Sequence, residues 1–557
     1  MTQPHQAMPL GPIENWTVRA IAERRLADSS ARPFIQEVGG PAESYGAFIG
    51  RAASLGAFLL DRGIRKGDTV SILCRNGIPS LHGWMAANLV GAVDVTINAS
   101  YRGDVLRHVL SITKPSLILV DAALLAQLSD IACDLPFLKD VILVQEHTET
   151  AQSEMLGISY HQYESVISTY QPALPNADLN PSDAAAVMFT SGTTGPSKGV
   201  LMPNAHVCLL AHQAIVNTRL TEDDVYYCAH PLNHIAGKFM GVLAAFAMGA
   251  RVVIDRRFDA ERWLNVIRDN GVTLSLAHGP MIEMIYATSP TAHDKDHAVR
   301  RLMCCPLPKT IGEAFETRFG LRGIEMWGMT EITCPCWTSF EGHRPQGSCG
   351  RPMLDWHDVK IVDPETDWEV GEGEVGEIVV RPRHPWMMMS GYMGMPDETV
   401  AAWRNLWFHT GDAAWRDSDG NFYIVDRIKD RIRRRAENIS SFDIESAALD
   451  FPSVREAAAV GAVPRHSAPQ YARCKMVYRS LEVQDIHACR DEATLVEFDA
   501  VLRRTHAWPV YHRLGNFLSS AWLGVLRRET HNQLRWVRDG CPVREKGPRF
   551  DPTILPE

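Results

Sequence analysis

A stretch of glycine and hydroxyl residues with one lysine, MFTSGTTGPSKGV at Met188–Val200, is well suited to bind an anion. Glycines let backbone N–H groups converge on one point, and the hydroxyls and the ammonium group add further donors. The spacing differs from that of a Walker loop, because Gly192 and Gly195 lie too close together and Lys198 is followed by glycine. The segment therefore predicts a phosphate-binding loop of another kind, with a flexible turn as the plainer interpretation.

Four further strings along the chain carry side chains suited to nucleotide or acyl chemistry. They are HPLNH (His230–His234), MWGMTE (Met326–Glu331), FHTGD (Phe408–Asp412) and VDRIKDRIRRRAENISSFDIE (Val425–Glu445). Together with TSGTTGPSKGV they resemble the ordered motifs of the adenylate-forming superfamily, over about residues 45–460. That superfamily includes acyl-CoA synthetases, luciferases and the adenylation domains of peptide synthetases, and the acyl-CoA ligase branch is the closest in character.

The resemblance implies a site for the nucleotide. In this site Trp327 takes the place of the family's adenine-stacking tyrosine, which its larger aromatic face suits. Asp412 would accept the ribose hydroxyls, because an ionised carboxylate only accepts hydrogen bonds; a turn residue after glycine is its plainer interpretation. The implied nucleotide-binding residues are Thr190, Ser191, Gly192, Thr193, Thr194, Lys198, Trp327, Gly328, Met329 and Asp412.

The resemblance also assigns groups close to the reacting phosphate. Glu331 would hold Mg²⁺, a hard cation that prefers carboxylate oxygen, although a glutamate at a helix N-terminus is the plainer interpretation. Thr330 would touch phosphate, and Arg427 would reach the ribose or the phosphate. His234 would act in the acyl site, within the gate motif. These four are the predicted catalytic residues.

Acyl and CoA sites are implied on either side of a hinge. Asn233, Gly237 and Lys238 are predicted to line the acyl pocket, and Lys429 falls at the hinge position. Beyond it, Arg433 and Arg434 would meet the CoA phosphates, with a solvated charged face as the equal alternative. Ala436 stands where the family has a glycine, so one extra methyl group borders the approach of the CoA thiol.

The chain departs from the family near its C-terminus. The family's adenylation step uses a lysine within a P-x-T-x-x-G-K string, and after Asp430 this chain has only Lys475 and Lys546, neither in such a string. Arg528 falls near the expected place in a weak alignment, but a planar guanidinium does not replace a compact ammonium. Loss of a positioned cation costs several kcal/mol of transition-state stabilisation.

The predicted function is formation of acyl-CoA and AMP from an acyl-adenylate and CoA, with adenylation from ATP weak or lost. A separate ligase would then supply the acyl-adenylate from a small carboxylic acid, and Mg²⁺ would be needed if adenylation occurs. One alternative is a complete ATP-dependent acyl-CoA synthetase in which Arg528 or Lys546 substitutes. Another is a non-catalytic acyl-adenylate-binding protein. A peptide-synthetase domain is disfavoured, because HPLNH has no aspartate for a substrate amine.

Strands and helices alternate in the region that carries these motifs. Residues 69–74, 93–98, 117–121, 250–255 and 273–278 read as buried strands, and residues 78–92 have helical periodicity. Asn204 is expected to cap a helix. The predicted fold is α/β, with a large N-terminal domain of α/β sheets and a β-rich subdomain (1–426), a hinge (427–430) and a small mobile α+β domain (431–557) that diverges after about residue 468.

Composition excludes some classes of protein. The formal charge is -10, whereas nucleic-acid binders carry a basic excess. No apolar run of membrane-spanning length and no signal-peptide pattern is evident. The twelve cysteines therefore read as reduced thiols, which predicts a cytoplasmic protein.

Overall fold

The computed structural model describes residues 9–144, 157–190 and 197–427, together with four short strands beyond them. The chain divides into two compact units, Met1–Lys429 and Asp430–Glu557. The predicted hinge and domain bounds stay a prediction. In the second unit the described strands are β22 (Ile432–Arg434) with β23 (Glu437–Ile439), and β24 (Ala457–Ala462) with β25 (Arg473–Tyr478), each pair antiparallel.

The first unit contains two large mixed sheets. One has the strand order β19-β9-β8-β4-β3-β5-β6-β7, and its members β4, β3, β5, β6 and β7 run parallel to their neighbours. Its strands are β3 (Thr69–Leu73), β4 (Val93–Thr96), β5 (Leu117–Asp121), β6 (Asp140–Val144), β7 (Ser159–Gln162), β8 (Ala184–Thr190), β9 (Lys198–Pro203) and β19 (Gly391–Tyr392). The helices in the first 170 residues are α1 (Val18–Ser29), α2 (Tyr45–Asp61), α3 (Ile78–Val90), α4 (Gly103–Thr113), α5 (Leu125–Ser129) and α6 (Tyr163–Thr169).

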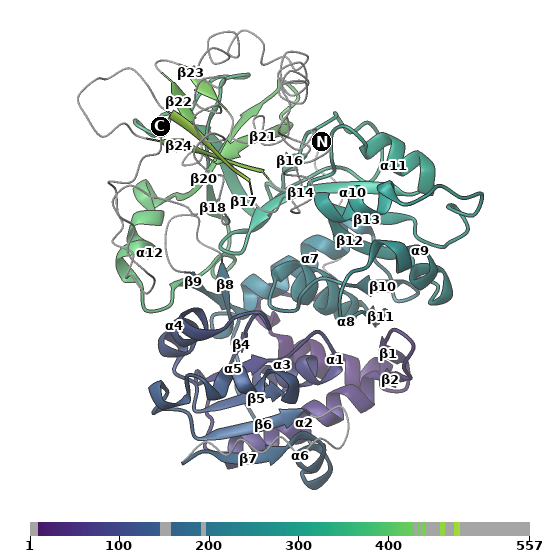
Figure 1. Ribbon diagram of the computed structural model, residues 1–557, viewed down its shortest axis with the longest axis vertical. Helices are drawn as coiled ribbons and strands as arrows, with labels where there is room; N and C mark the ends of the chain where they lie inside the picture. Colours follow the sequence, from purple (N-terminus) through teal and green to yellow (C-terminus); the bar gives the residue numbers. More distant parts are fainter. Residues whose placement is uncertain are drawn as a thin grey trace, which may run out of the picture. The chain divides into compact units, whose positions relative to one another are not determined.

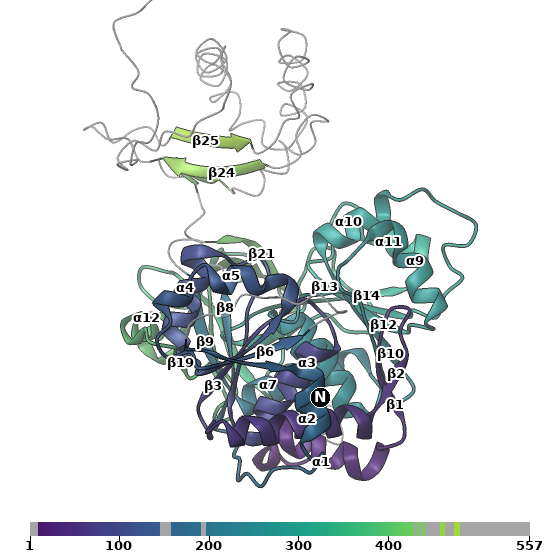
Figure 2. The same ribbon diagram turned by 60° about the horizontal axis from the view of Figure 1, so that its bottom comes forward.

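The other large sheet has the order β16-β15-β14-β13-β12-β10-β11-β1-β2. Its strands are β1 (Pro33–Glu37), β2 (Ala42–Ser44), β10 (Val225–Cys228), β11 (Arg251–Ile254), β12 (Leu274–His278), β13 (Arg301–Cys305), β14 (Arg322–Met329), β15 (Thr333–Trp337) and β16 (Arg351–Pro352). Helices α9 (Ala260–Asp269), α10 (Gly279–Ala287) and α11 (Gly312–Phe319) lie together beside β12 to β14 (Figures 1 and 2).

A third, four-stranded antiparallel sheet has the order β17-β18-β20-β21. Its strands are β17 (His357–Val362), β18 (Gly376–Pro382), β20 (Phe408–Arg416) and β21 (Phe422–Arg427), and α12 (Pro396–Ala402) precedes β20. These three sheets confirm the predicted α/β architecture with a β-rich part. The predicted strands and the predicted helix at 78–92 all form, within one or two residues of their expected bounds.

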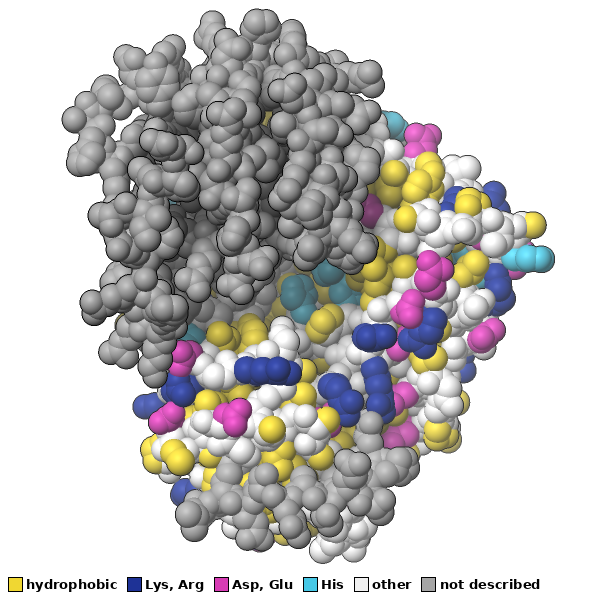
Figure 3. Space-filling model, in the orientation of Figure 1, with side chains coloured by type: hydrophobic (Ala, Val, Ile, Leu, Met, Phe, Trp, Pro, Cys, Tyr) yellow, Lys and Arg dark blue, Asp and Glu magenta, His cyan; other side chains and the backbone are white. Residues whose placement is uncertain are grey.

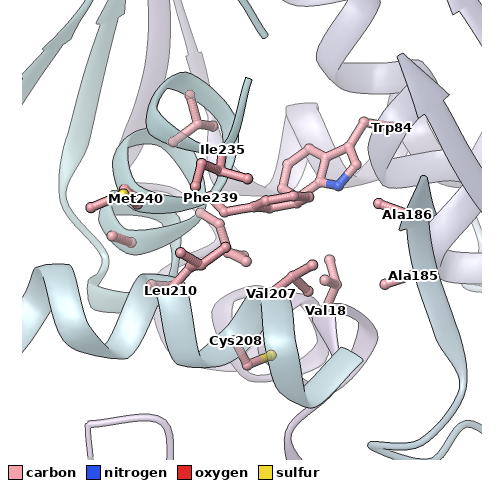
Figure 4. Packing of buried hydrophobic residues seen from close by; sticks show 14 of the residues in the cluster. Val18, Trp84, Ala185, Ala186, Val207, Cys208, Leu210, Ile235, Phe239 and Met240 are labelled. Carbon is pink, nitrogen blue, oxygen red and sulfur yellow. The ribbon is translucent and has the colours of Figure 1, made fainter. Parts of the chain in front are cut away.

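A shared apolar core joins the two large sheets. It includes α7 (Asn204–Thr218), the π-helix η4 (Ala236–Leu243) and α8 (Ala244–Met248). Figure 4 shows Phe239 of η4 lying between Trp84 of α3 and Val207 of α7, with Ala185 of β8 nearby. Full burial of an aromatic ring of this size contributes on the order of 2–3 kcal/mol, so this contact fixes η4 against both sheets.

The capping prediction for Asn204 was wrong. Pro203 occupies the N-cap of α7, and Asn204 is already the first helical residue. Its side-chain oxygen accepts from the backbone N–H of Val18 at 3.0 Å, and its amide donates to the carbonyl of Asp183 at 3.0 Å. The amide thus ties three chain segments together, a contact that local sequence does not reveal.

Candidate active site

The glycine-rich loop connects two antiparallel strands. In the hairpin of β8 and β9, Thr190 is the cross-strand partner of Lys198, so both predicted residues flank the same opening. Ser191, Gly192, Thr193 and Thr194 lie outside the described residues. The structure therefore describes the base of the predicted phosphate loop and not its tip.

Lys198 faces an aromatic ring that the sequence motifs did not single out. Its ammonium lies 4.7 Å from the centre of the Tyr392 ring, a separation at which the ring quadrupole attracts a cation. Tyr392 reaches this place because the two-residue strand β19 pairs with β9, with Tyr392 opposite Val200. A tyrosine nearly two hundred residues away along the chain thus supports the lysine of the loop.

The same tyrosine holds the predicted magnesium ligand. Its hydroxyl donates to Oε1 of Glu331 at 3.0 Å, and both side chains are buried. Burial and then the carboxylate of Glu331 raise the pKa of Tyr392, so the hydroxyl stays protonated and remains a donor. The backbone N–H of Met389 also donates to the carbonyl of Glu331, at 2.9 Å. Glu331 is thereby fixed in position.

The predicted adenine and ribose residues contact each other directly. The indole N–H of Trp327 donates to Oδ2 of Asp412 at 2.9 Å, and both side chains are buried. Trp327 lies on β14 and Asp412 on β20, so the bond joins the nine-stranded and four-stranded sheets. Asp412 is also the cross-strand partner of Arg427, whose side chain lies outside the described set. We call Lys198, Trp327, Glu331, Tyr392 and Asp412 the carboxylate cluster.

Glu377 positions the FHTGD turn. Its two carboxylate oxygens bond to the backbone N–H of Gly411 and to Nδ1 of His409, each at 2.9 Å. Gly411 has φ +73°, a conformation that glycine adopts at little cost. The hydroxyl of Thr410 then accepts from the N–H of Asp412 at 3.1 Å. Glu377 lies in a strand with an ordinary strand pattern, so this role could not be predicted from the sequence.

Gly328 is required by the close approach of two strands. A Cβ atom at this position would stand 2.1 Å from the carbonyl oxygen of Thr333 and 2.6 Å from Cα of Cys334. Glycine at this place lets β14 and β15 meet beside the Trp327 ring, and the register shifts between Trp327 and Met329. Thr330, half-buried, follows at the end of this turn.

Asn76 and Gly237 fix the position of the HPLNH segment. The Asn76 amide donates to the carbonyl of His230 at 2.8 Å, and its oxygen accepts from the N–H of Leu232 at 3.0 Å. A Cβ at Gly237 would stand 2.7 Å from the carbonyl oxygen of Pro231, so only glycine allows η4 to pack this closely. Asn76 was missed from the sequence, since it precedes a helix far from the motif.

Three histidine rings meet at this segment. The ring centroid of His278 lies 4.7 Å from that of His230 and 5.7 Å from that of His234, both edge to face. His230 is buried, His278 is half-buried and His234 is exposed. Figure 3 shows histidine side chains recessed in the middle of the visible face. We call these three residues the histidine cluster; His278 has no motif around it and was missed.

Two of these imidazoles, His230 and His234, have pKa values below the ordinary value for histidine. Burial, followed by the neighbouring rings, lowers the pKa of His230 to about 3, and desolvation, followed by His278, lowers the pKa of His234. His234 also retains exposed surface. The Nδ1 atom of His234 accepts from the N–H of Ala236 at 3.3 Å. The proton of this ring is therefore on Nε2.

Lys238 lies in a buried ion pair. Its ammonium donates to Oδ2 of Asp94 and to the hydroxyl of Thr96, each at 2.5 Å, and the side chains of Lys238 and Asp94 are fully buried. Burial lowers the pKa of Lys238 and Asp94 opposes this. The pair ties η4 to β4. The predicted roles of Lys238, Gly237 and the half-buried Asn233 in an acyl pocket stay predictions.

The remaining predicted residues fall largely outside the described set. Lys429 and Ala436 are not described, and for Arg433 and Arg434 only the backbone of β22 is. Among the residues that the structure describes, no group of three or more histidine, cysteine or acidic side chains could hold a metal ion. Glu331 thus fits Mg²⁺ as a single carboxylate whose other ligands would be substrate phosphates and waters, a mode that Mg²⁺ often adopts.

Comparison with known proteins gives one family. The model of the AMP-binding enzyme family matches residues 22–393. A crotonobetaine/carnitine–CoA ligase of Salmonella arizonae is 30% identical over 429 residues, which cover 74% of this chain and 79% of the relative. A feruloyl-CoA synthase of an Amycolatopsis species is 29% identical over 428 residues, covering 76% of this chain and 81% of the relative.

Solved structures share the fold. The anthranilate CoA ligase AuaEII in complex with anthranoyl-AMP aligns with a TM-score of 0.76 at 19% identity, covering 89% of this chain and 92% of that one. ATP-bound MatB from Rhodopseudomonas palustris aligns with a TM-score of 0.74 at 23% identity, covering 87% and 92%. Within the described part of the chain, no helix is both long and apolar enough to cross a bilayer.

Proposed function

Because this chain belongs to the AMP-binding enzyme family and is an acyl-CoA ligase, an acid–thiol ligase, we propose that it works chiefly on preformed acyl-adenylate. The CoA sulfur attacks the acyl carbonyl carbon, the bond from that carbon to the AMP phosphate oxygen breaks, and the thiol proton passes to solvent. Acyl-CoA and AMP result. Adenylation of the free acid with ATP is weak or lost in this proposal, and a separate ligase supplies the adenylate.

The observation that carries this proposal is the missing lysine string. After Asp430 the chain has Lys475 and Lys546 alone, and neither lies in a P-x-T-x-x-G-K sequence. Lys475 lies within β25, where its cross-strand partner is Val460. Adenylation joins two anions, a carboxylate and a triphosphate, so a positioned cation matters most in that step. Thioester formation has a good leaving group already and needs mainly alignment of thiol and carbonyl.

The described residues support binding of the adenylate. Trp327 offers an aromatic face for adenine, and Asp412, fixed by the Trp327 N–H, offers acceptors for the ribose. Thr190 and Lys198 stand at the base of the loop proposed to meet phosphate. His234, exposed within the HPLNH segment, is proposed to border the acyl group. The free thiols of the described cysteines support the cytoplasmic location predicted from the sequence.

A complete ATP-dependent ligase is the second candidate, and one observation favours it. Glu331 is held by Tyr392 beside Lys198, an arrangement suited to a magnesium-bound triphosphate. When bound, Mg²⁺ would neutralise phosphate charge at this carboxylate. The relatives carry names with different acids, among them carnitine and ferulate, so the family alone leaves the acid open.

Two parallel reactions distinguish the candidates. Purified protein is incubated with synthetic acyl-AMP and CoA, and separately with free acid, ATP, Mg²⁺ and CoA, and acyl-CoA is quantified by mass spectrometry. Thioester from acyl-AMP alone supports the proposal. Equal rates in both reactions would establish the complete ligase. Binding of acyl-AMP without any thioester would identify the chain as a non-catalytic acyl-adenylate-binding protein.

A further inference from the structure

A cavity of about 270 Å³ lies on one face of the four-stranded sheet. Its floor is a row of side chains across β17, β18 and β20 (Figure 1), because Lys360 pairs with Val379 and Val379 pairs with His409. Its rim comes from two loops, at residues 366–368 and 405–407. A cavity just below the usual size of small-molecule sites has room for one ring with a small substituent.

The rim of this cavity is aromatic. Trp368 is 79% exposed, and apolar surface of this size left in water is typical of an interaction site. Across the cavity, the Trp407 ring has the ammonium group of Lys360 4.2 Å from its centre. The two indoles therefore offer flat apolar surfaces on which the ring of a ligand can pack.

The cavity also contains a cation without an acidic partner. The carboxylates around it are already matched, because Asp367 is paired with Arg404 and Glu377 contacts the ring of His409. Within the part of the chain that the structure describes, Lys360 forms no ion pair. An anion that enters the cavity thus finds an ammonium group on the floor and no competing carboxylate on it.

The two loops of the rim hold each other in an unusual conformation. Asp367, Asn405 and Leu406 have φ values of 60°, 52° and 63°, which are uncommon for residues other than glycine. The Asn405 amide and the Arg404 guanidinium both donate to the carboxylate of Asp367. Strained backbone of this kind persists where the surroundings hold it, and it is frequent at ligand sites.

We propose that this cavity binds a planar aromatic monocarboxylate and that this binding tightens the nucleotide site. The carboxylate pairs with the Lys360 ammonium, and the ring packs against Trp368 and Trp407. This site is separate from the site proposed for the reacting acyl group. The bound acid is a regulator there and not a substrate, since the cavity adds no residue to the carboxylate cluster.

Glu377 connects the cavity to the residue proposed to hold the ribose. One of its carboxylate oxygens lies 2.9 Å from Nδ1 of His409, which lines the cavity, and the other accepts from the N–H of Gly411 at 2.9 Å. Asp412 follows directly. A ligand packed on His409 keeps this turn in place and so favours the conformation that presents Asp412. This coupling rests on the proposed nucleotide site, whereas the cavity itself does not.

Calorimetry on the full chain with three small probes tests the chemistry of the cavity. Benzoate is expected to bind about tenfold tighter than benzamide, which has the same shape without the charge, because a bond to a charged group is lost. Cyclohexanecarboxylate keeps the charge without the flat ring and is expected to bind about fivefold more weakly than benzoate. Failure of benzoate to bind at millimolar concentration would overturn the proposal.

Variants assign the binding to this cavity. In Lys360→Met, benzoate and benzamide are expected to bind equally. Trp368→Ala, at an exposed side chain, is expected to weaken both about fivefold. Lys139→Met, at an exposed lysine before β6, is the control and should leave benzoate binding unchanged. A preference for benzoate that survives in Lys360→Met would mean that benzoate binds elsewhere, and would also overturn the proposal.

Titration of AMP with and without saturating benzoate tests the coupling. AMP is expected to bind about fivefold tighter with benzoate, and benzoate about fivefold tighter with AMP, because coupling is reciprocal. Both factors should be about one in Lys360→Met. Equal AMP affinity with and without benzoate would overturn the coupling, and weaker AMP binding would place benzoate in the active site. Absence of AMP binding under both conditions would overturn the proposed function, while the preference for benzoate would still support the cavity.

Discussion

The carboxylate cluster and the histidine cluster lie in the same unit of the chain but differ in how their ionisable side chains are stabilised. In the carboxylate cluster, Glu331 and Asp412 are charged side chains held by neutral donors, Tyr392 and Trp327. In the histidine cluster, burial lowers the pKa of His230 and of His234, and ring nitrogens of His234 and His278 lie within hydrogen-bond distance of backbone groups. The first arrangement is proposed to bind the nucleotide part of the adenylate, and the second is proposed to border its acyl part.

The largest expected effect concerns the ion pair behind the histidine cluster. Lys238→Met leaves Asp94 buried without its cation, so we expect a loss of about 3–5 kcal/mol in the free energy of unfolding. Urea denaturation measures it. The double variant Lys238→Met with Asp94→Leu should recover most of the loss, because no charge then remains buried. Lys139→Met, at an exposed lysine, should change stability by less than about 0.5 kcal/mol. An equally small change in Lys238→Met would contradict the buried pairing.

Asp412→Ala tests whether charge matters in the carboxylate cluster. It removes the acceptor for the ribose and leaves the Trp327 N–H without its bond, so we expect kcat/KM for acyl-AMP to fall by about 10²–10³. Steady-state thioester assays measure the fall. Asp419→Asn, in an exposed turn after β20, is the matched control. An unchanged kcat/KM would show that the ribose is held elsewhere.

Acid should destabilise the protein through the histidine cluster. The folded-state pKa of His230 is about 3, below the unfolded value of about 6.5, so the unfolded chain gains protons first as the pH falls. This contribution is complete above pH 6.5 and declines towards pH 3, by about 2 kcal/mol at pH 5. His230→Leu should make the curve of stability against pH shallower by that amount. Parallel curves for the two proteins would mean that the His230 pKa is the same in the folded and unfolded states, which would contradict the prediction.

Tyr392→Phe is expected to have the smallest effect. It removes the bond to Glu331 but keeps the ring beneath Lys198. We expect the Mg²⁺ concentration needed for half-maximal ATP binding to rise about tenfold, from loss of one bond to a charged group. Tyr392→Leu removes the ring as well and should weaken ATP binding without Mg²⁺ too. If both variants respond alike, the hydroxyl has no separate role.

The sequence motifs located the carboxylate cluster but not the residues that hold it. Thr190, Lys198, Trp327, Glu331 and Asp412 were recognisable because each sits in a short string with fixed spacing. Tyr392 holds Glu331 from 61 positions away, and Glu377 holds Gly411, the neighbour of Asp412, from 34 positions away. Such partners have no local pattern, since they are chosen by strand pairing that only the fold reveals.

The histidine cluster was harder to predict for a related reason. His234 was recognised from HPLNH, but His278 ends an ordinary buried strand and joins the cluster only through the order of β10 and β12 in the sheet. Lys238 was expected near the acyl group from its place after the motif. Its partner Asp94 lies 144 positions away, so the sequence could not show that the charge is already neutralised.

Because of the bond between Trp327 and Asp412, nucleotide binding is also expected to stabilise the contact between two sheets. The bond links an inner strand of the nine-stranded sheet to an inner strand of the four-stranded sheet, and the proposed adenine and ribose contacts are with its two residues. A ligand that grips both ends would oppose any local opening between those sheets. Amide hydrogens of β14 and β20 should then exchange more slowly with solvent when AMP is bound. Hydrogen exchange would therefore measure occupancy of the nucleotide site without any turnover and without knowing which acid the protein uses.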